Sequence, residues 1–269
     1  MKTRRLLTIF LGFTVLLKGA LFAEGSISSP SATPTAGEAS SSDAQALLAR
    51  AYTAMGCAAI GKDTSITLTG LLKLPSSTGP AMRVTIHSQG NDRWRSELDT
   101  PKEHKVTIVN AGEGEIQHQD GRVTKLARHN TFHQRPTHVP CLTNLGLLPA
   151  KLDISYLRMD TVPGDTLDVI ELTPKERPSV KKLADRTKVT LWISRGSGYL
   201  IKLQYINASE QQMDDTQTVE VGYSDYRIVD GVAVPFRQIT TDGPMVLELA
   251  VDSVQMNTAA ADFTLRGRQ

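Results

Sequence analysis

The stretch from Arg186 to Val254 decides the fold, because it consists almost entirely of alternating apolar and polar residues. It begins RTKVTLWIS (residues 186–194) and continues, after the turn RGSG, with YLIKLQYIN (residues 199–207). Three more runs follow: TQTVEVGYSDYRI (216–228), VAVPFRQITT (232–241) and MVLELAVDSV (245–254). Asp-Gly pairs stand between the last three. Alternation of this kind is typical of half-buried strands, and an Asp-Gly pair between two such runs predicts a hairpin turn. The stretch therefore predicts five successive antiparallel strands.

The same alternation occurs earlier in the chain. It predicts strands over residues 64–74, 81–88, 93–99, 105–110, 115–119, 122–127, 153–159 and 166–173. Gly70, in the middle of the first of these, predicts a bend or bulge. We expect about ten or eleven antiparallel strands that curl into a half-open barrel, since curling shields the edges of a sheet. Two flat sheets packed as a sandwich are the alternative, which accounts less well for the helices.

Two helices accompany these strands. Asp43–Met55 predicts an N-terminal helix that ends at Gly56, with one apolar stripe formed by Leu47, Leu48, Ala51, Tyr52 and Met55. A helix with a single apolar stripe packs that stripe on another element, which here is the sheet. Residues 128–149 break the strand pattern, and Leu142–Leu148 predicts a short middle helix. The fold class is therefore mainly β, with two helices.

The first residues predict export. Residues 1–23 have the basic start, apolar centre and small-residue exit of a secretory signal peptide. An uncleaved anchor helix is the alternative, but Lys18 interrupts the apolar run before it reaches the roughly 20 residues that span a bilayer. Residues 24–42, rich in Ser, Thr, Pro and Ala, predict a flexible spacer. Residues 43–269 then form one β-rich domain, which we expect in the periplasm, with cleavage near Ala23.

Charge argues against a nucleic-acid partner. The whole chain has 30 basic and 28 acidic residues, for a net charge of +2. The predicted signal peptide removes four basic residues and no acidic one, so the mature chain has 26 basic against 28 acidic residues. Nucleic-acid binding needs clustered Lys and Arg, and no such cluster remains.

Enzyme and metal motifs are also absent from the sequence. It has no G-x-S-x-G elbow, H-E-x-x-H pair, phosphate loop or dinucleotide glycine pattern. Asp225, Asp230 and Asp242 stand at predicted turns, where Asp commonly bonds its own backbone. The histidines that could form a metal site are His118, His129, His133 and His138, but prolines interrupt the run and no acid lies within it. We predict neither an enzyme nor a metal site, and no cofactor.

The chain has two cysteines, Cys57 and Cys141. In an oxidising compartment two cysteines usually pair, whereas in the cytosol they would be free thiols. Cys57 follows the first predicted helix and Cys141 precedes the second. A bridge between them would hold both helices at one mouth of the barrel.

Three stretches resemble a known family: TLTGLLKLP (67–75), TLWISRGSGYLIKLQY (190–205) and YSDYRIVDGVAVPFRQITTDG (223–243). Their strand-and-turn pattern, with the preceding helix, resembles the outer-membrane lipoprotein-sorting carriers (LolA/LolB-like periplasmic proteins), over roughly Asp43 to Leu265. The resemblance implies a half-open barrel whose concave apolar face is covered by helices, with a cavity for acyl chains. Ser194 stands where many relatives carry Asp.

Alternation identifies apolar residues that could point to a common interior. As candidates for lining a cavity we take Leu68, Val84, Ile86, Trp94, Leu98, Val106, Ile108, Leu191, Ile193, Leu203, Val221, Phe236, Leu247 and Leu249. A filled core is the alternative for each of them. As candidates for a movable lid we take Leu47, Leu48, Tyr52, Leu142 and Leu145.

These observations favour a periplasmic carrier or chaperone that binds a lipid, or the acyl chains of a lipoprotein, without covalent chemistry. Each buried methylene contributes about 0.8 kcal/mol, so an acyl chain can bind without any catalytic residue. The alternative is an envelope sensor of the same fold that recognises a lipidated or misfolded partner. We expect a monomer, with envelope membrane proteins as further partners.

Overall fold

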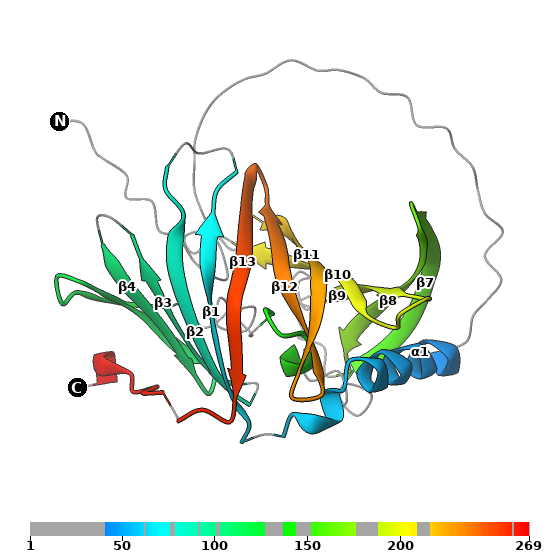
Figure 1. The fold of residues 1–269 in the computed structure, drawn as a ribbon, viewed down its shortest axis with the longest axis horizontal. Coiled ribbons are helices and arrows are strands. Elements are labelled where there is room, and N and C mark those ends of the chain that lie inside the picture. Colours follow the sequence, from blue (N-terminus) through cyan, green and yellow to red (C-terminus); the bar gives the residue numbers. More distant parts are fainter. Residues whose placement is uncertain are drawn as a thin grey trace, which may run out of the picture.

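The computed structural model describes residues 41–61, 63–75, 79–90, 92–100, 103–126, 137–143, 152–175, 188–208, 216–259 and 261–268. The predicted signal peptide and nearly all of the predicted spacer lie outside these residues. In the described part, one α-helix and several short 3-10 turns accompany a single large curved antiparallel sheet (Figure 1). The prediction of a mainly β, half-open barrel is thereby confirmed.

The helix α1 spans Ser41–Ala54, and the 3-10 turn η1 follows it at Cys57–Ala59. The first half of the sheet consists of β1 (Ser65–Lys73), β2 (Met82–Gln89), β3 (Arg93–Asp99), β4 (His104–Asn110), β5 (Glu113–His118) and β6 (Val123–Lys125). After the 3-10 turn η2 (Pro140–Thr143), the second half consists of β7 (Leu152–Val162), β8 (Asp165–Pro174), β9 (Val189–Ser194), β10 (Leu200–Ala208), β11 (Thr216–Val229), β12 (Val232–Asp242) and β13 (Met245–Met256). The 3-10 turn η3 (Arg266–Arg268) comes last.

The strands form one sheet of thirteen in the order β6-β5-β4-β3-β2-β1-β13-β12-β11-β10-β9-β8-β7. The chain builds one half outward from β1 to β6, crosses to the opposite edge at β7, and returns strand by strand to β13. The pairing of β1 with β13 joins the two halves. Each of the thirteen segments predicted as a strand is present in this sheet, including the three-residue β6, so the expected total of ten or eleven strands was too low.

The bulge predicted at Gly70 is present. The register between β1 and β13 shifts between Thr69 and Gly70, and a Cβ on Gly70 would lie 2.4 Å from the carbonyl oxygen of Ala250. Only glycine allows this close approach of two backbones, which bends the sheet where its halves meet. The predicted hairpin at Asp230-Gly231 also forms, with both residues at positive φ, as its tight turn requires.

The two helices match their predictions to different extents. Helix α1 lies beside β7 at one end of the barrel (Figure 1). Of the predicted middle helix Leu142–Leu148, the first residues belong to η2, and residues 144–148 lie outside the described part of the chain. In the described ranges, no helix is long and apolar enough to cross a membrane.

Candidate functional site

One face of the sheet, here called the inner face, carries the main apolar cluster. Backbone register places the alternate residues of neighbouring strands on this face, for example Leu68 opposite Ile86 and Val84 opposite Leu98. The cluster also includes α1 and the described segment 137–143, so it joins one side of the sheet to what covers it. Eleven of the predicted cavity-lining residues belong to it: Leu68, Val84, Ile86, Leu98, Leu191, Ile193, Leu203, Val221, Phe236, Leu247 and Leu249.

The structure places the other three candidates elsewhere. Trp94 shares the inner face but belongs to a separate cluster with Val109, Ile116 and Leu126. Val106 and Ile108 lie on the opposite, outer face, where Phe263 of the C-terminal segment packs on them. Both faces of β4 are buried, so alternation along this strand did not identify the face that points inward.

Helix α1 contributes its predicted stripe to the inner-face cluster. Leu48, Ala51 and Met55 are buried, and the lid candidates Leu47 and Tyr52 are partly buried against the cluster. The C-terminal end of α1 is fixed to the sheet, since the backbone N–H of Ala233 donates to the carbonyl of Met55 at 2.9 Å. The helix is therefore attached at the β11–β12 hairpin.

A charged contact joins the middle of α1 to the sheet. Asp168 of β8 is 1 % exposed, and its carboxylate accepts a hydrogen bond at 2.9 Å from the guanidinium of Arg195. Arg50 of α1 reaches the other carboxylate oxygen at 3.5 Å, and the Tyr156 hydroxyl donates to Asp168 at 3.3 Å. Burial, followed by the nearby Asp168 charge, raises the pKa of Tyr156. Both guanidinium groups are about half exposed, so this cluster lies at the rim of the barrel.

The segment 137–143 is the second cover of the inner face. A disulfide joins Cys57 to Cys141, with a Cα–Cα distance of 5.0 Å, which confirms the predicted pair. The Tyr223 hydroxyl donates to the carbonyl of Thr137 at 2.8 Å, and the Gln238 amide donates to the carbonyl of His138 at 2.8 Å. The disulfide therefore links this segment to the end of α1. The side chains of the lid candidates Leu142 and Leu145 lie outside the described part of the chain.

Several buried polar groups of the inner side have no hydrogen-bond partner within the part of the chain that the structure describes. They are the indole N–H of Trp94, Nε2 of His138 and both carboxylate oxygens of Asp242. Burial lowers the pKa of His138 to about 4 and raises that of Asp242 to about 6. The turn acids were predicted to bond their own backbone, and for Asp242 this is wrong, since it points to the inner side of β12 as the last residue of that strand.

The histidines do not form a metal site in the described ranges. His118 hydrogen-bonds to the Glu103 carboxylate at 2.7 Å, and His138, which is part of segment 137–143, is buried. His129 and His133 lie outside the described residues. Within the part of the chain that the structure describes, no three His, Cys, Asp or Glu side chains gather as metal ligands would.

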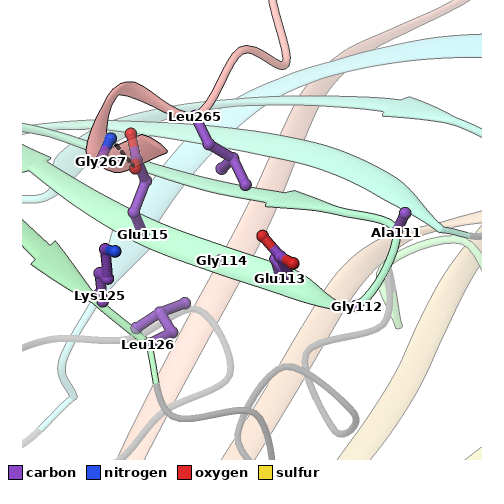
Figure 2. Close-up of a pocket in the computed structure, with 9 residues that line it drawn as sticks. All are labelled: Ala111, Gly112, Glu113, Gly114, Glu115, Lys125, Leu126, Leu265 and Gly267. Atoms are coloured by element: carbon purple, nitrogen blue, oxygen red, sulfur yellow. Dashed lines mark hydrogen bonds between the residues drawn. The ribbon is translucent and has the colours of Figure 1, made fainter. Parts of the chain in front are cut away.

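Two pockets in the described part of the chain are lined mostly by residues outside the inner-face cluster. The first, of about 410 Å³, is bounded by the β4–β5 turn, the strands β5 and β6, and the C-terminal segment (Figure 2). Figure 2 shows the Glu115 carboxylate bonded to the backbone N–H of Gly267, beside Leu265. The second, of about 400 Å³, adjoins Trp192, whose ring centroid lies 3.8 Å from Nζ of Lys202. Sequence patterns did not identify either pocket, because each depends on segments that are distant in the chain.

The described sheet, with its single N-terminal helix at one end, defines a LolA-like half-open barrel. Similar solved structures include a LolA superfamily protein from Nitrosomonas europaea, with 16% identity and a TM-score of 0.52 over 81% of this chain and 94% of that one. An outer membrane lipoprotein-sorting protein domain from Vibrio parahaemolyticus shows 13% identity and a TM-score of 0.55, over 83% of this chain and 96% of that one.

A DUF1329 family protein from Desulfovibrio piger shows 10% identity and a TM-score of 0.56, over 84% of this chain and 99% of that one. At these identities the likeness establishes the fold, which is the one that the sequence resemblance implied. No profile of a known protein family matches the chain, and no curated protein matches it in sequence.

Proposed function

We propose that this protein is a periplasmic carrier that binds a lipid, or the acyl chains of a lipoprotein, on the inner face of its sheet. One observation carries the proposal: a continuous apolar cluster joins the inner face to two covers, α1 and segment 137–143. An acyl chain that displaced these covers would contact the apolar surface that the covers bury. Burial contributes about 0.8 kcal/mol per methylene, so a chain of lipid length offsets the displaced contacts.

The contacts of the two covers suggest how the barrel opens. The end of α1 is fixed by the bond between Ala233 and Met55, and η1 is fixed to segment 137–143 by the disulfide. The middle of α1 is held by the apolar stripe around Leu48 and by the 3.5 Å contact between Arg50 and Asp168. The helix would therefore swing about Gly56 and uncover the rim near β7.

The likeness to lipoprotein-sorting structures supports this proposal through the fold, and the predicted signal peptide supports the periplasmic location. Non-covalent carriage also agrees with the lack of enzyme motifs in the sequence. An envelope partner that delivers or receives the cargo would meet the protein at this rim.

Native mass spectrometry of the mature protein, purified gently from its exporting host, tests the carrier proposal. We expect a bound acyl species that disappears on denaturation and is recovered by solvent extraction. A ligand-free mass would contradict the proposal if the protein also takes up no amphiphile with a neutral, cationic or anionic head. The inner-face cluster would then be a core, and capture of an envelope protein would be the next experiment for the sensor alternative.

A further inference from the structure

The inner side of β12 carries a row of polar residues within the apolar cluster. Gln238, Thr240 and Asp242 alternate with outward residues along the strand. The first of them holds segment 137–143 through the carbonyl of His138. Asp242 is 2 % exposed, and neither oxygen of its carboxylate has a hydrogen-bond partner. The row therefore ends in a buried acid to which no described group donates a hydrogen bond.

The neighbours of Asp242 are mainly apolar. Register places it opposite Val219 of β11 and Met245 of β13, and Thr240 beside it lies between Val221 and Leu247. Burial, and then the nearby charge of Asp242, raises the pKa of Tyr205 of β10, which lies opposite Val219. Among the described residues, neither carboxylate oxygen of Asp242 has a hydrogen-bond partner, and no Lys, Arg or His forms an ion pair with it.

A carboxylate in this environment is costly. Burial of an acid without hydrogen bonds is unfavourable, and native structures satisfy nearly all buried polar groups, so an exception of this kind is a candidate for binding a polar group of a ligand. Ligand pockets are mostly apolar, with a few polar groups that fix the orientation of the ligand. Asp242 has this position, as a polar group at one end of the inner-facing residues of β12 and beside Val219 and Met245 of the neighbouring strands.

We propose that Asp242 binds the polar head of the cargo, and that this head carries an N–H or O–H donor, with an ammonium group bound most tightly. This inference rests on the proposed function, because it assigns the head-group preference of the same inner face. The acyl chain would extend from Asp242 past Val221 and Leu247. An anionic head would be repelled by the ionised carboxylate, so the site selects amine- and hydroxyl-bearing amphiphiles over fatty acids.

The test compares dodecylamine, dodecanol and dodecanoate, which share one chain and differ in the head. Their affinities are measured at pH 7.5 by displacement of a neutral solvatochromic dye from the mature wild-type protein, Asp242→Asn and Asp252→Asn. Asp252 is an exposed residue of β13 that pairs with Arg83 at 3.7 Å, so its variant removes one negative charge away from the inner face. Thermal melts establish that each variant is folded.

We expect wild-type protein and Asp252→Asn to prefer dodecylamine to dodecanoate by about tenfold or more, since a charge pair at short range in a partly buried site contributes more than 1.4 kcal/mol. In Asp242→Asn the ratio of the affinities for dodecylamine and dodecanoate should fall close to one. The affinity for dodecanol should change least. Binding of all three without a head preference, or a preference that persists in Asp242→Asn, would overturn this inference and leave the carrier proposal standing. If none of the three binds, both proposals fail.

Discussion

Gly56 lies so close to Gly231 that a Cβ on residue 56 would come within 1.9 Å of the carbonyl oxygen of Gly231. Gly56 also has a φ of 69°, in the left-handed region that suits glycine at the end of a helix. This contact, together with the hydrogen bond from Ala233 to the carbonyl of Met55, seats the C-terminal end of α1 on the turn between β11 and β12. The way the helix covers the barrel therefore depends on two glycines that are far apart in the chain.

The Gly56→Ala variant should lose about 3 to 5 kcal/mol of unfolding free energy, because backbone strain and a clash with another backbone add together. Gly121→Ala is the matched control, since Gly121 has a φ of 83° and a Cβ on it would meet no heavy atom within 4 Å. The control should lose only about 1 kcal/mol, from strain alone. Urea denaturation compares the two, and equal losses would contradict the role given to the Gly231 contact.

The disulfide is expected to contribute much of the stability of the covered barrel. Cys57 and Cys141 are 84 residues apart, and in the chain-entropy description of cross-links a bridge over that span contributes about 4 to 5 kcal/mol. The double variant Cys57→Ser/Cys141→Ser should therefore unfold at a clearly lower urea concentration, and wild-type protein should match it after reduction. A thiol titration of the unreduced, denatured protein should find no free sulfur; two reactive sulfurs would exclude the bridge.

Much of the fold follows from local sequence patterns. Alternation located the strands, Gly70 predicted the bulge, and the Asp-Gly pair at residue 230 predicted a tight turn. These features depend on neighbours in the chain or on one hairpin partner, so the pattern that produces them is visible in the sequence. The predicted export to an oxidising compartment also predicted the disulfide Cys57–Cys141 correctly.

The remaining features depend on distant segments. Alternation divides β4 into two faces, but it does not indicate that Phe263, far along the chain, covers Val106 and Ile108. Alternation likewise could not show that Trp94 is separate from the main cluster, because this separation depends on the curvature of the whole sheet. Asp242 begins the sequence Asp-Gly-Pro, which predicts a turn. This local pattern did not indicate that Asp242 is an unpartnered buried acid, because its burial results from the packing of β10, β11 and β13.

One buried acid binds the end of the C-terminal segment, whose Phe263 also packs on the outer face. The Glu115 carboxylate is 2 % exposed and accepts hydrogen bonds from the backbone N–H groups of Arg266 and Gly267, at 2.8 and 3.0 Å, and from the Gln117 amide at 2.8 Å. Burial alone would raise the pKa of Glu115, but these bonds, with Gln117 first, outweigh it and lower the pKa.

In Glu115→Gln, the amides of Arg266 and Gly267 should exchange with solvent about tenfold faster, because a neutral acceptor binds an N–H less strongly than a carboxylate. Since the folded pKa of Glu115 is lowered, its contribution is present above the unfolded pKa and is lost as the pH falls through the folded value. Hydrogen exchange at pH 7 measures the effect. Glu113→Gln, at an exposed position of the same strand, is the control and should leave both amides protected.

Asp242 should give the opposite dependence on pH. Burial raises the folded pKa of Asp242 to about 6, from an ordinary value of 3.8, so protonation favours the folded state. Its stabilising effect is complete below about pH 4 and is lost as the pH rises through 6. Asn cannot ionise, so Asp242→Asn should exceed the wild type by about 3 kcal/mol in unfolding free energy at pH 8 and equal it near pH 4. Denaturation across this range, with Asp252→Asn as the exposed control, measures the difference; a variant less stable than wild type at pH 8 would show that the ionised carboxylate has a partner in the ligand-free protein.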